Sequence, residues 1–357
     1  IHKSAQEFLP NPVNSILIDD LERAVRVEVC IERLQSHAGT WNKRIRVNGN
    51  DWISIPEVPG MTDPERYQSM IYPVVQIPLD QVVEGTNTFE FTTSGQFCHN
   101  INWGQWIVPG VTFRVYYEGE KPAVRGRITA PAAGSSFGID PRIEVAVDDP
   151  ARTERVDVIG RYYDWNYEGD LIWRQWHYTY RYGELQHHIG SDTSAPFTVT
   201  WATDWLPEQQ QPVELAAWIR STSGYYTMTP VVGDLAFDRA DGCRVELYRA
   251  EEIPEKWQTR EGQDHQCTVR IPSLDGATEA QLYLCSWSGG HADGIGINGH
   301  EIVEYVGYPH LLSYDILDVP VEVLREGENH PYTYSESHHH GIEVQLPGMP
   351  VKVKYRR

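Results

Sequence analysis

Apolar and polar residues alternate with a period of two along most of the chain. The clearest runs lie at residues 25–31, 113–117, 143–147, 198–201 and 351–355. Alternation of this kind predicts strands with one buried face and one exposed face. Helix-length periodicity is nearly absent, and Gly, Pro, Asn and Asp separate the short runs. We therefore predict an all-β fold made of antiparallel β-sandwiches.

The two ends of the chain carry the same motifs in the same order. In the first third they are Ser-His-Ala-Gly at 36–39, Val-Asn-Gly at 47–49, Ile-Pro-Leu at 77–79, Glu-Gly-Thr-Asn at 84–87, Cys-His-Asn-Ile at 98–101 and Pro-Gly at 109–110. In the last third they are Gly-His-Ala-Asp at 290–293, Ile-Asn-Gly at 297–299, Val-Pro-Val at 319–321, Glu-Gly-Glu-Asn at 326–329, His-His-Gly-Ile at 339–342 and Pro-Gly at 347–348. A strand pattern ends each series. This order predicts two copies of one domain.

The repeated motifs contain turn chemistry, because Asn and Gly tolerate a positive φ. An Asn-Gly turn, an Ile/Val-Pro-Leu/Val strand, a Glu-Gly-x-Asn turn and an aromatic strand follow one another. This order resembles the galactose-binding-like jelly roll of many carbohydrate-active proteins, over about two thirds of the chain. The resemblance implies jelly rolls at 1–121 and 239–357. That family includes sugar binders, spacers and a few catalytic relatives, so it specifies the ligand poorly.

Residues 122–238 have a different pattern, with strand runs at 143–147, 156–159 and 213–220 and Ser-Asp-Thr-Ser-Ala-Pro-Phe at 191–197. This order resembles the bacterial immunoglobulin-like modules of extracellular polysaccharide-degrading proteins. Those modules reach the Ser-Asp-Thr segment by a short turn, whereas this chain has an insertion at 161–188. We predict three β-sandwiches in the order jelly roll, immunoglobulin-like, jelly roll.

The insertion is rich in Trp and Tyr, and its alternation at 176–182 predicts a hairpin with one aromatic face. Aromatic rings stack on the apolar faces of sugars, and charged or amide side chains bind sugar hydroxyls. The predicted ligand-binding residues are Trp165, Trp173, Trp176, His177, Tyr178, Tyr180, Arg174, Asp170 and, outside the insertion, Trp103 and Trp106. Alternatively, these aromatics pack against the flanking domains and make the body rigid.

Composition narrows the classes of partner. The chain has 357 residues, with 12 Trp and 20 Tyr against 8 Phe. Its net charge of −20 argues against nucleic acid, and against anionic polysaccharide unless a basic patch or calcium intervenes. No apolar run approaches the ~18 residues of a membrane helix, so we expect no membrane insertion. The chain begins at Ile1 without a leader, and we expect a processed bacterial protein that is secreted or bound to the cell surface.

Two patterns suggest metal binding. Asp164, Asn166, Glu168 and Asp170 supply oxygen atoms at alternate positions with a Gly at the sixth, an order that looks like a degraded calcium loop. The alternative is an acidic hairpin tip. The repeat also pairs His37 with His291 and His99 with His340. These histidines bind zinc or copper, take part in catalysis, or join two loops by hydrogen bonds.

Five cysteines, with no CxxC pair, argue against a structural zinc site. Cys30 and Cys98 are the first pair to test for a disulfide, and buried thiols are the alternative. We find no Gly-x-Ser-x-Gly, phosphate-binding Gly loop, His-Glu-x-x-His or catalytic-cysteine motif, so no catalytic residue is assigned.

Three functions therefore remain open: polysaccharide or oligosaccharide binding without catalysis, a polysaccharide hydrolase or lyase with Glu/Asp or Tyr/His as acid and base, and a structural module of a cell-envelope protein. The first is the principal prediction. The oligomeric state is not predicted.

Overall fold

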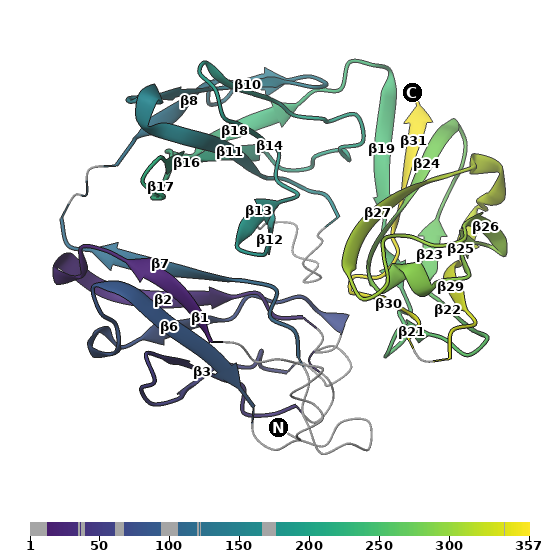
Figure 1. Ribbon diagram of the computed structural model, residues 1–357. Coiled ribbons are helices and arrows are strands. Elements are labelled where there is room, and N and C mark those ends of the chain that lie inside the picture. Colours follow the sequence, from purple (N-terminus) through teal and green to yellow (C-terminus); the bar gives the residue numbers. More distant parts are fainter. Residues whose placement is uncertain are drawn as a thin grey trace. The chain divides into compact units, whose positions relative to one another are not determined.

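The protein is all-β, as predicted (Figure 1). The computed structural model describes residues 13–34, 36, 40–60, 68–93, 106–119, 121, 123–165, 176–338 and 340–357. The chain forms two compact units, Ile1–Pro122 with Tyr180–Glu184, and Ala123–Thr179 with Leu185–Arg357. We find no helix in the described ranges with the length and apolarity needed to cross a membrane. The predicted three-domain bounds stay a prediction.

The first unit contains two antiparallel sheets, with strand orders β1-β6-β3-β4 and β5-β2-β7. The strands are β1 (Asn14–Ile18), β2 (Ala24–Ile31), β3 (Arg44–Val47), β4 (Ile53–Ser54), β5 (Val74–Ile77), β6 (Gly85–Thr92) and β7 (Val111–Tyr117). Val27, Val29 and Ile31 enter the core because alternate residues of a strand face the same side. Glu28, on the other face of β2, pairs with Arg114 of β7.

The second unit begins with a sandwich of the sheets β15-β10-β8 and β14-β11-β16-β18-β9, with β17 paired to β16. The strands are β8 (Gly126–Ala130), β9 (Ser136–Phe137), β10 (Arg142–Val147), β11 (Thr153–Arg161), β14 (Gly190–Asp192), β15 (Phe197–Thr200), β16 (Val213–Ser221), β17 (Tyr226–Met228) and β18 (Val232–Phe237). Val156 and Val158 of β11 pack with Trp201 in the core. The expected hairpin is present as β12 (Thr179–Arg181) and β13 (Glu184–Gln186).

The second unit also contains a C-terminal sandwich. Its sheets are β19-β31-β24-β30-β21 with β27 on β24, β20-β23-β28, and β22-β29-β25-β26. The strands are β19 (Cys243–Tyr248), β20 (Ala250–Glu251), β21 (Gln258–Thr259), β22 (Gln263–Gln266), β23 (Thr268–Ile271), β24 (Ala277–Trp287), β25 (Gly294–Ile297), β26 (His300–Val303), β27 (Leu312–Val319), β28 (Gly327–Asn329), β29 (Pro331–Ser335), β30 (Ile342–Val344) and β31 (Val351–Arg356). Leu282, Leu284 and Trp257 lie in its core.

An asparagine pair fixes a turn in the first unit. Asn48 and Gly49 have φ values of 51° and 71°, so both residues adopt the left-handed conformation that an Asn-Gly hairpin turn requires. The Nδ2 of Asn48 donates to Oδ1 of Asn87 at 2.8 Å, and the Thr88 amide donates to Oδ1 of Asn48 at 2.8 Å. Asn87 also accepts from the Val83 amide. The two side chains therefore join two turns from inside the fold.

The same hydrogen bonds occur around Asn298 and Asn329 in the C-terminal sandwich. The Nδ2 of Asn298 donates to Oδ1 of Asn329 at 2.8 Å, and the His330 amide donates to Oδ1 of Asn298 at 2.9 Å. Asn329 accepts from the Arg325 amide and donates to the carbonyls of Arg325 and Gly327. The matched Asn-Gly and Gly-x-Asn motifs thus have matched structural roles.

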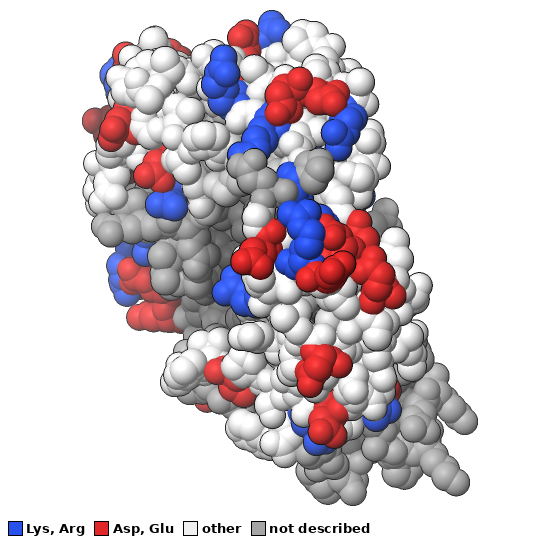
Figure 2. Space-filling view, turned by 90° about the vertical axis from the view of Figure 1, so that its left-hand side faces the viewer, with Lys and Arg blue, Asp and Glu red and all other residues white. Residues whose placement is uncertain are grey.

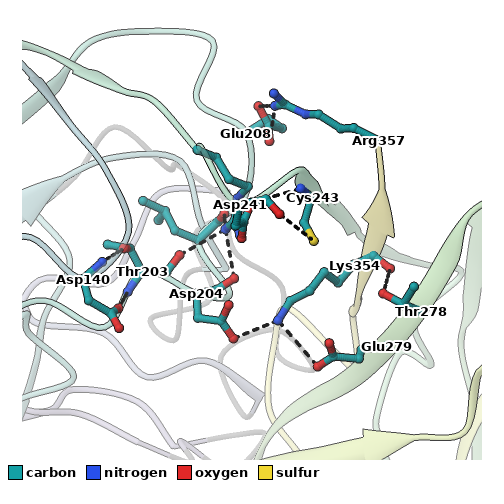
Figure 3. A network of polar contacts seen from close by, with 12 residues as sticks. Asp140, Thr203, Asp204, Glu208, Asp241, Cys243, Thr278, Glu279, Lys354 and Arg357 are labelled. Carbon is teal, nitrogen blue, oxygen red and sulfur yellow. Dashed lines mark hydrogen bonds and ion pairs between the residues drawn. The ribbon is translucent and has the colours of Figure 1, made fainter.

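Strand β31 differs from what its alternation predicts. The pattern places Lys352 and Lys354 on a solvent face, yet they are only 3% and 5% exposed. The ammonium of Lys354 lies 2.8 Å from Oδ2 of Asp204 and 3.5 Å from Oε2 of Glu279 (Figure 3). The sandwich that begins the same unit supplies Asp204, so packing between two sandwiches covers a face that is polar in sequence.

Arg239 completes this junction within the second unit. Its guanidinium donates to the carbonyls of Thr203, Asp204 and Leu206 at 2.9–3.1 Å and pairs with Asp241. At the end of the chain, Arg357 donates to both carboxylate oxygens of Glu208 at 3.0 Å (Figure 3). Bidentate pairs of this kind hold a fixed geometry.

Cys30 is buried in β2, and Cys98 lies outside the described residues. The proposed Cys30–Cys98 disulfide therefore stays a prediction. Cys267 is a free, buried thiol, and burial raises its pKa to about 12. It is consequently protonated and unreactive at neutral pH.

We predict that Asn329→Ala destabilises the second unit. The change removes the bonds that the buried Asn329 side chain makes to Asn298 and to the backbone of Arg325 and Gly327, so the free energy of unfolding should fall by about 3 kcal/mol. Urea unfolding followed by intrinsic fluorescence measures this loss. Glu322→Ala, at an exposed position on the same connection, is the control and should shift stability by less than about 0.5 kcal/mol. An unchanged urea midpoint for Asn329→Ala would contradict the stabilising role.

Candidate functional site

The predicted sugar-binding residues lie in several separate environments. Four of them, Trp103, Asp170, Trp173 and Arg174, fall outside the described residues. The other six are Trp106, Trp165, Trp176, His177, Tyr178 and Tyr180. Trp106 and Tyr180 belong to the first unit and the other four to the second, so each is described with its own neighbours.

Trp165 is part of a packed junction in the second unit. Its side chain is 5% exposed and meets the ring of Tyr283 edge-on, with centroids 5.5 Å apart. Next to it, the Asp164 carboxylate lies 2.5 Å from the ammonium of Lys352, which sits 4.6 Å from the Tyr283 ring centre. The recess beside Asp164 and Trp165 measures about 20 Å³, which holds a water molecule but no sugar ring. Trp165 is therefore a packing residue.

Tyr180 is also buried, at 6% exposure, in the first unit. Its ring meets Tyr72 edge-on with centroids 6.3 Å apart. The amides of Tyr182 and Gly183 donate to the two carboxylate oxygens of Glu32 at 2.9 and 2.8 Å. Burial raises the pKa of Glu32 despite these two bonds. Tyr180 thus belongs to a hydrogen-bonded turn and offers no stacking face.

His177 and Trp176 pack against the start of the insertion. The His177 ring stacks on Tyr162 with centroids 4.0 Å apart and an interplanar angle of 14°. The guanidinium of Arg161 lies 4.9 Å from the Trp176 ring centre. These contacts hold the insertion to β11, which supports the packing alternative for this part of it.

Tyr178 belongs to an aromatic row that sequence reasoning missed. It meets Trp218 edge-on at 6.0 Å, and Trp218 meets Tyr226 edge-on at 5.9 Å. Tyr226 is 42% exposed and receives a bond from Arg155. The signal was available, because Trp218 occupies a polar-face position of the strand run at 213–220. The sequence did not show which aromatic residues would contact Trp218, because Tyr178 and Tyr226 come from separate segments of the chain.

Trp106 lines a recess of about 770 Å³ in the first unit. Its ring meets Phe91 edge-on, with centroids 5.6 Å apart. The described lining is Val13, Asn14, Ser15, Ile16, Phe89, Phe91, Trp106, Val108, Pro109, Gly110 and Val111. The volume is in the range of small-ligand sites, although the exposed lining of this recess is more polar than apolar.

The recess lies between the edges of the two sheets of the first unit. Among the described strands, β1 pairs only with β6, and β7 pairs only with β2. Residues 13–16 and 108–111 therefore supply backbone amides and carbonyls at strand edges beside the aromatic wall. An apolar wall next to backbone donors and acceptors is the combination that a sugar ring requires.

A serine, a histidine and an aspartate meet near β11 without forming a catalytic triad. The Ser191 hydroxyl donates to Oδ1 of Asp157 at 2.5 Å and lies 2.7 Å from Nε2 of His188. That same Nε2 lies 3.6 Å from Asp157 Oδ1. In a triad, histidine uses one ring nitrogen for serine and the other for the carboxylate. Burial also lowers the pKa of His188, so this cluster is a buried polar network.

The predicted metal residues are only partly described. Asn166, Glu168, Asp170, His37 and His99 lie outside the described residues. The Asp164 carboxylate is engaged by Lys352. Calcium binding at this loop therefore stays a prediction. His291 and His340 do lie close together in the C-terminal sandwich, with ring centroids 6.2 Å apart.

Charged residues of opposite sign are interspersed on the face shown in Figure 2, where Lys and Arg lie beside Asp and Glu. Within the second unit, Arg220 pairs with Glu154 and Arg270 pairs with Glu251. Both cations are therefore neutralised locally.

No family model and no curated protein matches the chain. Among solved structures, it is similar to the fibronectin(III)-like modules of CbhA from Clostridium thermocellum (23% identity, 32% of this chain and 94% of that one, TM-score 0.20). It is also similar to a beta-porphyranase of glycoside hydrolase family 86 from Bacteroides plebeius (12% identity, 72% and 42%, TM-score 0.27). A third is SGBP-B of the Bacteroides ovatus mixed-linkage glucan utilization locus, in complex with a heptasaccharide (10%, 96% and 70%, TM-score 0.16). At these scores the likenesses carry no argument about fold or function.

We predict that Asp164→Ala destabilises the second unit, because it leaves the buried ammonium of Lys352 without its carboxylate. The free energy of unfolding should fall by about 3 kcal/mol. The double variant Asp164→Ala/Lys352→Met should recover most of that loss, because the uncompensated charge is gone. Thermal and urea unfolding of the two variants measure the difference. A double variant less stable than the single one would contradict this account.

Proposed function

We propose that this protein binds a neutral polysaccharide or oligosaccharide through the recess of its first unit. The observation that carries the proposal is the recess of about 770 Å³, with Trp106 and Phe91 on its wall. Trp106 supplies the stacking face. The backbone of residues 13–16 and 108–111, with Asn14 and Ser15, supplies hydrogen-bonding groups for sugar hydroxyls.

The chemistry of the lining favours binding over catalysis. Glycoside hydrolysis needs two carboxyl groups, and elimination from a uronate needs a base such as Tyr or His. The described residues that line the recess include no Asp, Glu, His or Tyr. A hydrolase or lyase is therefore the second candidate, and it would need groups from elsewhere in the chain.

The charge of the chain favours a neutral ligand. A net charge of −20 repels anionic polysaccharides at low ionic strength. The ion pairs of the second unit leave those cations little capacity for sulfate or uronate groups. A neutral glycan avoids this repulsion, so we place neutral glycans first among the ligands.

The burial of Trp165 and Tyr180 supports a structural role for those parts of the insertion, and so favours the packing alternative there. Among the described candidates, Trp106 therefore stands beside a recess large enough for a sugar ring, whereas the recess beside Trp165 holds only a water molecule. The two-copy jelly-roll architecture, and a bacterial secreted or surface location, remain part of the proposal.

The test is affinity electrophoresis of the full chain in gels that contain neutral or anionic polysaccharides. We expect retardation by at least one neutral polysaccharide, and Trp106→Ala should weaken that binding more than about tenfold. Trp52→Ala is the matched control. Trp52 belongs to the same unit, does not line the recess and lies 4.6 Å from the guanidinium of Arg46. Its variant should bind normally.

Two outcomes would overturn the proposal. Retardation that Trp106→Ala leaves unchanged would place the site elsewhere. A lack of retardation across neutral polysaccharides would reject glycan binding and favour the structural module. Release of reducing ends or unsaturated uronates from a retarded polysaccharide would instead establish the hydrolase or lyase.

A further inference from the structure

Three histidines from three separate loops meet at one end of the C-terminal sandwich. They are His291, which follows β24, His310, which precedes β27, and His340, which precedes β30. Their ring centroids are 4.6 Å apart for His310 and His340, 5.2 Å for His291 and His310, and 6.2 Å for His291 and His340. The repeat pattern pointed to His291 and His340, but only the fold adds His310.

We propose that His291, His310 and His340 bind one divalent transition-metal ion of the zinc, copper or nickel class. Imidazole nitrogen suits these ions. An ion about 2.0–2.1 Å from each nitrogen lies about 3.2 Å from each ring centre, so rings at 95–120° have centroids about 4.7–5.5 Å apart. Two of the three pairs have nearly this spacing, and the third is longer.

The backbone brings the first two loops together. Gly290 lies so close to the other loop that a Cβ atom there would be 2.5 Å from Cδ of Pro309. Ser288 and His310 both have left-handed backbones, with φ of 57° and 59°. The His310 amide donates to Oγ of Ser288 at 2.9 Å. Non-glycine residues in this conformation are strained, and surrounding structure must hold them there.

The loop that carries His340 also lies against a neighbouring strand. Gly341 follows His340, and a Cβ atom at Gly341 would lie 1.6 Å from the carbonyl oxygen of Thr259. Only glycine allows this approach, so the chain that carries His340 is fixed against β21. All three imidazoles thus project from backbone that neighbouring strands position.

One ring nitrogen of His291, the buried Nε2, makes no hydrogen bond to the described residues and could therefore bind an ion. A buried nitrogen without a partner costs free energy, which a bound ion would recover. Neutral imidazole is the form that binds a metal ion.

Ion binding requires the rings to turn. In the conformation observed, no group of three or more His, Cys, Asp or Glu among the described residues is placed to hold a metal ion. His310 and His340 are exposed, so their rings border solvent and not the core. The fixed part of the site is its backbone, and the ion orders the rings.

The test titrates chelator-treated full chain with zinc, copper and nickel salts by calorimetry. We expect one ion per chain, with His291→Ala and His310→Ala each weakening the affinity more than about tenfold. His300→Ala is the control, because His300 is an exposed histidine in β26 of the same sandwich, and it should bind normally. Affinity should fall as the pH is lowered, because protonated imidazole cannot bind the ion.

Circular dichroism checks that each variant folds. If His291→Ala does not fold, His310→Ala still decides the test, because His310 is exposed and its replacement should leave the fold intact. The proposal is overturned if no ion binds. It is also overturned if both variants bind as tightly as the unaltered chain, which would place the ion on the adjacent run at 338–340 alone. These outcomes are independent of glycan binding in the first unit.

Discussion

Every second residue of a strand faces the core of a β-sandwich, and this constraint determines where the protein can place chemistry. Val27, Val29 and Ile31 in the first unit, and Leu282 and Leu284 in the second, are used for packing. Groups that act on a ligand must come from the outer faces, the strand edges and the loops. The recess beside Trp106 lies at strand edges, and the histidine cluster lies in loops.

The outer faces are largely used for packing between elements of the second unit. Lys352 and Lys354 lie on the polar side of β31, yet both are buried against carboxylates of the sandwich that begins the second unit. Trp165 packs next to them. Buried ion pairs cost desolvation free energy and contribute little net stability, but a lone charge left behind is strongly unfavourable. Such pairs consequently specify which surfaces pack together.

The turns of both units depend on particular asparagine and glycine residues. The asparagine pairs at Asn48 and Asn87, and at Asn298 and Asn329, satisfy backbone groups that a sharp turn would otherwise leave unpaired. Glycines at positions 290 and 341 allow backbones to approach where any side chain would clash. The asparagine pairs were visible in the sequence as a repeated motif. The close approaches at the two glycines were not visible, because the sequence does not show which distant atom packs against a glycine.

The sequence by itself determined the all-β class, the positions of the main strands, the Asn-Gly turns and the hairpin of the insertion. Period-two alternation and turn residues act locally, so their consequences can be read without the fold. Only the tertiary structure decided which aromatics are buried, because exposure depends on partners far along the chain. It buried Trp165 and Tyr180, placed Trp106 in a recess, and brought His310 to His291 and His340. Such contacts between distant segments leave no periodic signal in the sequence.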